Sequence, residues 1–136
     1  MANTTLAAFL DKAVIIPFHN YSGSDIVDGA LLKVDGSNVG TATKAPGMIP
    51  TTATTDVPVG IAIGVAKAGG TGKMAISGAA VGLAKGAVTH GDVLMPGSTS
   101  GTVSTQTSAK AQIGTAFGSA ADGDPCLVLI APAKNA

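Results

Sequence analysis

The chain has 136 residues with eight lysines, eight aspartates, no arginine and no glutamate, so its formal net charge is zero. This length is typical of one domain, and a neutral chain without arginine lacks the basic surface that nucleic-acid binding requires. Alanine contributes 24 of the apolar residues and only four side chains are aromatic, which predicts a core of small aliphatic side chains.

The first eighteen residues differ from the rest of the chain. Leu6, Phe9, Leu10 and Val14 follow helical spacing behind Thr5, a residue type that caps helices, whereas residues 14–18 have the pattern of an extended segment. A short helix and an extended arm both stay open as interpretations. No cationic region precedes this stretch and charged residues interrupt it, so we expect no secretory signal.

The remainder of the chain predicts short strands separated by turns, because β-branched residues are abundant and glycine, proline and aspartate recur between them. The clearest strand is 59–66, in which large side chains alternate with glycine or alanine. After the glycine-rich turn at 69–72 the alternation resumes at 73–77, which predicts a hairpin. Further strands are expected at 30–34, 81–84, 93–95, 101–104, 112–117 and 126–130, the last in a central position because it is apolar on both faces.

These elements predict an all-β fold, a small β-barrel or sandwich. Residues 1–18 would form an N-terminal docking arm or short helix, and residues 19–136 a single β-rich domain. No internal repeat with a period of 20 to 50 residues is visible. The uncharged central run, 57–66, is far shorter than the ~18 residues that a membrane helix needs, so we expect no membrane partner.

The sequence motifs that could mark a catalytic or binding site are poor matches to the known patterns. The segment Gly69 to Lys73 lacks the spacing of a phosphate-binding loop, and 97–101 places a threonine where a nucleophile elbow needs serine. His90 with Asp92, and Asp122 with Asp124, could form an acid–base pair or a cation site, but an aspartate before an apolar run usually bonds local backbone amides. We therefore expect no catalytic residue, no cofactor and no metal, and we expect the single cysteine, Cys126, to be an inert core thiol.

Several segments, in order, resemble the head decoration or cement proteins of tailed bacteriophages. They are Thr54-Thr55-Asp56, Val59-Gly60-Ile61, Gly91-Asp92-Val93-Leu94-Met95-Pro96, Ile113-Gly114-Thr115-Ala116 and the closing apolar strand, and they cover roughly residues 54–131. The resemblance implies a β-rich, barrel-like body, trimeric in many members, that is made in the bacterial host cytoplasm. It also implies that the body sits on the outer capsid surface and holds neighbouring major capsid subunits together.

The leading hypothesis is therefore a structural virion protein whose partners are the major capsid protein and further copies of itself. Another assembly subunit, such as a head-fibre, tail or surface-layer module, is the main alternative. A carbohydrate-binding module is disfavoured because sugar platforms usually need exposed aromatic side chains. The apolar residues of the first segment are the expected capsid or inter-subunit contacts: Leu6, Phe9, Leu10, Val14, Ile15, Ile16 and Phe18.

Overall fold

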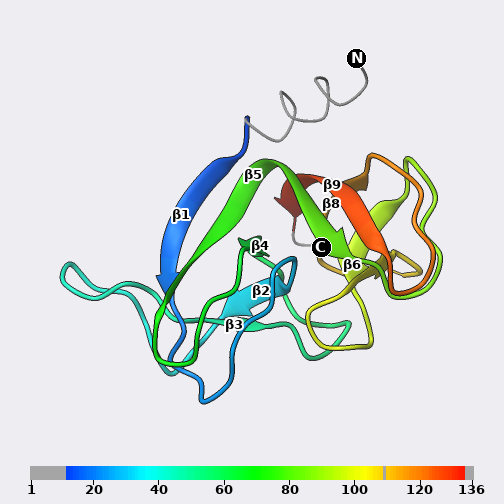
Figure 1. Cartoon of the computed structure of the whole chain (residues 1–136). Helices are drawn as coiled ribbons and strands as arrows, with labels where there is room; N and C mark the ends of the chain where they lie inside the picture. The colour runs from blue at the N-terminus through cyan, green and yellow to red at the C-terminus, as the bar shows by residue number, and fades with distance from the viewer. Residues whose placement is uncertain (1–11, 109, 134–136) are drawn as a thin grey trace.

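The computed structural model describes residues 12–108 and 110–133, and within these ranges the chain contains strands and turns but no helix. The strands are β1 (Val14–His19), β2 (Leu31–Val34), β3 (Met48–Pro50), β4 (Gly60–Ile63), β5 (Thr71–Leu83), β6 (Val93–Pro96), β7 (Val103–Thr105), β8 (Gln112–Ala116) and β9 (Pro125–Ala133). They pair antiparallel in the order β3-β2-β4-β5-β9-β8-β6-β7, with β1 on β5 (Figure 1). The expected all-β, barrel-like fold is confirmed.

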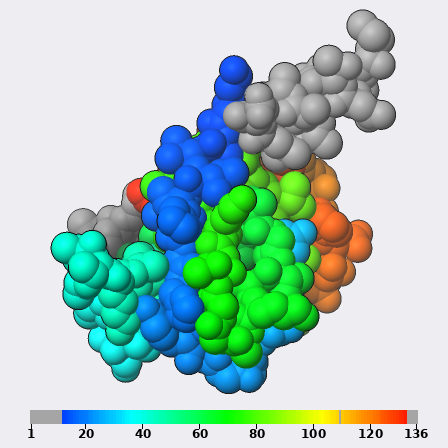
Figure 2. Space-filling view, turned by 60° about the vertical axis from the view of Figure 1, so that its left-hand side comes forward, coloured from blue at the N-terminus to red at the C-terminus, as the bar shows by residue number. Residues whose placement is uncertain are grey.

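The long strand β5 belongs to both halves of the molecule. Its residues 71–77 pair with β1 and β4, and its residues 78–83 pair with β9. Figure 2 shows β1 in blue beside the green strands of the first half. Between the two parts lies Gly78 at φ 85°, where an added Cβ would lie 2.8 Å from the Lys12 carbonyl oxygen. A side chain at this position would be strained and would collide with the incoming chain.

Each half curls and closes on itself through a parallel bridge. In the first half, residues 12–77, His19 bridges Gly47; in the second half, residues 78–133, Ala84 bridges Val103. Two small barrel-like bodies therefore share β5, and each has its own buried cluster. Phe18, Leu32, Met48 and Met74 are in the first cluster.

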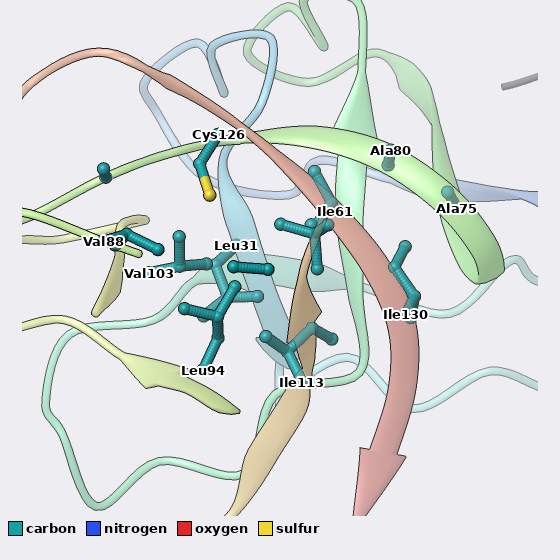
Figure 3. Packing of buried hydrophobic residues seen from close by; sticks show 13 residues of the cluster. Leu31, Ile61, Ala75, Ala80, Val88, Leu94, Val103, Ile113, Cys126 and Ile130 are labelled. Atoms are coloured by element: carbon teal, nitrogen blue, oxygen red, sulfur yellow. The ribbon is translucent and has the colours of Figure 1, made fainter. Parts of the chain in front are cut away.

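The second cluster is built from both halves. Side chains of β6 to β9 point into the second barrel, and Leu31, Ile61 and Ala75, which lie on the outer face of the first half, close it (Figure 3). All three of these residues are 0% exposed. The outer face of the first half thus forms part of the hydrophobic core of the second half.

The two halves have the same strand plan. The strand order is β1-β5-β4-β2-β3 in the first half and β5-β9-β8-β6-β7 in the second. In each half the last strand of this order returns to the first through the parallel bridge. The sequence carries the trace of this repeat, because 59–66 reads Val-Gly-Ile-Ala-Ile-Gly-Val-Ala and 113–120 reads Ile-Gly-Thr-Ala-Phe-Gly-Ser-Ala. The offset of these segments is 54 residues, which lies just beyond the periods of 20 to 50 in which no repeat is visible.

The repeated glycines have a common physical reason. A Cβ at Gly60 would lie 2.6 Å from the Ala75 carbonyl oxygen, and a Cβ at Gly114 would overlap the Leu129 carbonyl oxygen. Ala75 and Leu129 are themselves 54 residues apart. The neighbouring backbone therefore approaches too closely for any side chain at the same position of both halves.

Most of the expected strands are confirmed, and the differences are informative. Strand 126–130 is central, between β5 and β8, and the hairpin of β4 and β5 forms around the turn at 69–70. Segments 73–77 and 81–84 prove to be parts of one strand, and β3 was not predicted.

The segment expected as an N-terminal arm, residues 1–18, overlaps the sheet at its inner end. Residues 14–19 form β1, which pairs with β5 along its whole length. Phe18 is 0% exposed in the first cluster, since its ring lies over Gly72. The chain therefore belongs to the sheet from residue 14 onward.

Candidate functional site

The expected contact residues of the N-terminal segment have different environments. Val14 and Ile15 are 50% and 47% exposed, so they are available to a partner. Ile16 is half-buried against the first cluster, and Phe18 is a core residue of that cluster. Leu6, Phe9 and Leu10 lie outside the described residues.

A shallow apolar groove runs along the junction of the two halves beside Ile15. Its lining is Ala13, Ile15, Asp28, Ile63, Ala79, Ala80 and Val81. A second hollow on the other side of Ile15 is lined by Ile15, Ile16, Pro17 and Lys73. Among the described residues of the two linings, one aspartate and one lysine are the only charged ones, so this surface suits an apolar protein partner better than an ionic ligand.

The groove continues onto the outer face of the second half. Val81 and Leu127 are directly paired, and the Phe117 N–H donates to the Leu127 carbonyl oxygen at 2.9 Å, so these three side chains form one row across the sheet. Val81 is 38% and Phe117 39% exposed, and Leu127 is partly exposed. Sequence reasoning missed this face, because the apolar residues of 126–130 on both faces were read only as the sign of a central strand.

Two of the polar candidates, Asp92 and Asp122, accept hydrogen bonds that hold neighbouring backbone in place. Asp92 accepts the Thr89 N–H at 2.9 Å and the Thr105 hydroxyl at 2.8 Å, and these hydrogen bonds lower the pKa of its carboxyl. Asp122 accepts the Gly86 N–H at 2.7 Å. The expected bonding of aspartate to local backbone amides is confirmed at Asp92, and the ring of His90 rests 6.0 Å from that of Phe117.

Cys126 lies in the core, as expected. Its side chain is 1% exposed, and burial raises the pKa of the thiol, with a further contribution from the charge of Asp92. A thiol that stays protonated is a poor nucleophile.

An ion pair joins β2 to the loop 51–56 at the surface of the first half. Lys33 Nζ lies 3.0 Å from a carboxylate oxygen of Asp56. Partial burial raises the pKa of Asp56, but hydrogen bonds from the Thr52 amide, from Lys33 and from the Ala53 amide outweigh this effect and lower the pKa to about 2. Asp56 therefore holds the loop 51–56 onto β2.

Within residues 12–108 and 110–133, no group of three or more histidine, cysteine, aspartate or glutamate side chains is placed to hold a metal ion. The same part of the chain contains no helix long and apolar enough to cross a membrane.

The comparisons with known proteins rest on the fold. No protein-family model matches the chain, and no curated protein matches its sequence. Among solved structures, the chain is similar to the "N base" of the head fibre protein gp8.5 of bacteriophage phi29, with a TM-score of 0.67 and 18% identity. The match covers 90% of this chain and 99% of that one, so the fold of the phage protein is shared over nearly its whole length.

Proposed function

We propose that this chain is a structural protein of a bacteriophage head that attaches to the outer surface of the capsid through contacts with the major capsid protein. The observation that carries the proposal is the similarity of its fold, over 90% of the chain, to the base of a phage head fibre. The resemblance of residues 54–131 to head decoration proteins points in the same direction from the sequence.

Two roles are consistent with such a location, and the fold favours one of them. As the base of a head fibre, the chain would anchor a projecting structure; as a cement protein, it would bridge neighbouring capsid subunits. The fibre-base role is the first choice, since the similar solved structure is a fibre base. In either role the protein acts as a homotrimer and is not an enzyme, and it uses neither cofactor nor metal.

Co-sedimentation tests the proposal directly. The purified full chain is mixed with expanded capsids, from the virus that encodes it, that were assembled without this protein. Saturable binding to the capsids supports the proposal, and absence of binding to them contradicts it. Replacing His90 and Asp92 together should leave this binding unchanged apart from effects on stability, because the Asp92 carboxylate bonds Thr89 and Thr105 of this chain and the His90 ring packs beside Phe117.

Capsid stability separates the two roles. A cement protein should raise the temperature at which the capsid opens, because it links neighbouring subunits. A fibre base should bind without such a shift. A large increase in the opening temperature on saturation would therefore favour the cement role over the fibre-base role.

A further inference from the structure

The two halves are joined by a single crossing of the chain. The first half ends at Ser77 and the second begins at Gly78, both within β5, which arches over the two halves (Figure 1). Among the described residues, every strand pair and every isolated bridge joins partners of the same half. One half can therefore move away from the other without loss of strand pairing in either.

The contact between the halves is part of the hydrophobic core. Leu31, Ile61 and Ala75 of the first half are 0% exposed because the second cluster packs on them. Backbone hydrogen bonds also cross the contact: the Leu31 N–H donates to the Gly101 carbonyl oxygen at 2.8 Å, and the Gly101 N–H donates to that of Thr51 at 2.9 Å. Each half therefore needs a partner half, and a second copy of the chain offers the same surface as the chain itself.

The backbone at Gly78 decides which partner half is within reach. Gly78 has φ 85°, a conformation that glycine adopts freely and other residues rarely adopt. An added Cβ would lie 2.8 Å from the Lys12 carbonyl oxygen and 2.8 Å from the Ala13 Cα atom. A residue with a side chain would thus favour extended backbone at this position, as in the rest of the strand. That change would straighten β5 and carry residues 78–133 away from their own first half.

We propose that two copies of this chain can exchange their second halves, with Gly78 as the hinge, and that the positive φ of Gly78 keeps the native chain closed on itself. In the exchanged dimer, Leu31, Ile61 and Ala75 of each copy complete the second cluster of the other. The interface is the one that the chain already forms, so no new surface is required. Exchange of an identical element is a low-cost route to a dimer, and hinge substitutions promote it. The inference does not depend on attachment to a capsid.

The test is the mass of the full-length variant Gly78→Val, measured by light scattering after gel filtration over a range of concentrations. Valine at 78 is strained in the closed chain and unstrained in an extended β5. Because each dimer relieves two such hinges, the association constant should rise about a hundredfold or more over that of the native chain. A species of twice the native mass should therefore appear.

Gly123→Val is the matched control. Gly123 has φ 84° and lies in the turn between β8 and β9, within the second half, and an added Cβ has nothing within 4 Å. The substitution introduces the same backbone strain away from the crossing. It should lower the stability and leave the mass as in the native chain. Dimers of Gly123→Val as abundant as those of Gly78→Val would overturn the inference, because strain alone would then suffice.

A mixing experiment separates exchange of halves from association through surfaces. Dimers of Gly78→Val with and without ¹⁵N label are combined, and their masses are measured by native mass spectrometry. Exchanged dimers should form mixed species only after unfolding in urea and refolding, because their shared cores must first open. Mixed dimers that form on simple dilution would contradict the proposal.

Two further substitutions at the hinge keep the test valid if the valine variant fails to fold. Gly78→Ala adds the smallest side chain and should also form dimers. Gly78→Asn adds a Cβ at the same place, but asparagine accepts positive φ more readily, so it should form fewer dimers than Gly78→Ala. A folded Gly78→Val or Gly78→Ala chain that keeps the native mass at all concentrations overturns the inference.

Discussion

The burial of Phe18 makes β1 a structural part of the fold, and Phe18→Ala tests this directly. The ring occupies the first cluster, where a Cβ at Gly72 would lie 2.7 Å from its Cζ atom. Removal of the ring leaves an alanine opposite a glycine. Neighbours in the same cluster include Ala62 and Ala66, whose side chains are too short to extend into the space.

The expected cost is near the upper end of the range for such substitutions. Phe→Ala in a core costs about 3–5 kcal/mol, and the cost is greatest where the surroundings cannot collapse. The free energy of unfolding of a native domain is typically about 5–15 kcal/mol, so the variant should still fold but with much lower stability. The midpoint of thermal unfolding should fall by roughly 10–20 °C.

Thermal and urea unfolding, followed by circular dichroism, measure the effect. Phe117→Ala is the matched control, because it removes the same ring from a position that is 39% exposed, and it should cost less than half as much. A shift for Phe18→Ala no larger than that of the control would show that β1 is not part of the cooperative fold, and would restore the view of residues 1–18 as a separate arm.

Three further predictions concern the same fold. Gly114→Ala should destabilise the protein strongly in urea unfolding, because the new methyl group would overlap a neighbouring backbone carbonyl, whereas Gly36→Ala, with nothing within 4 Å of the added atom, should have little effect. Because the pKa of Asp56 is lowered to about 2 in the folded state, its contribution of up to ~2 kcal/mol is present above about pH 4 and is lost as the pH falls toward 2. Asp56→Asn should therefore show a smaller loss of stability over that interval than the native chain. Deletion of residues 1–16 removes half of β1 and should lower the unfolding midpoint strongly.

The sequence predicted those elements whose side-chain pattern is strong. Alternation of large and small residues marked β4 and the first part of β5, and the apolar run 126–130 marked a central strand. Strand β3 carries too little signal, since it has three residues and ends in proline. The unity of β5 was hidden by Gly78 and the alanines after it, which read as an interruption but serve as the bend between the halves.

The candidate contacts were harder to predict because exposure depends on packing between distant segments. Clustering of large apolar residues near the N-terminus suggested docking for all of them. It could not show that Gly72, far along the chain, leaves room for the Phe18 ring. The exposure of Val81 and Phe117 on the outer face of the second half was equally hidden, because it depends on how strands far apart in the sequence pack.

The duplication also explains why two equivalent barrels need different side chains. In the first barrel, Phe18 is paired with Gly72 and its ring fills the interior. In the second barrel the equivalent pair is Gly82 and Cys126. There Ile61 of the first half fills the interior, and its Cδ1 atom lies 3.6 Å from the position of a Cβ added at Gly82. The first half thus fills its own core, whereas the second depends on the first for closure. Because this dependence runs in one direction, the outer face of the second half stays partly exposed, with Val81, Val93 and Phe117 between 37% and 39% exposed.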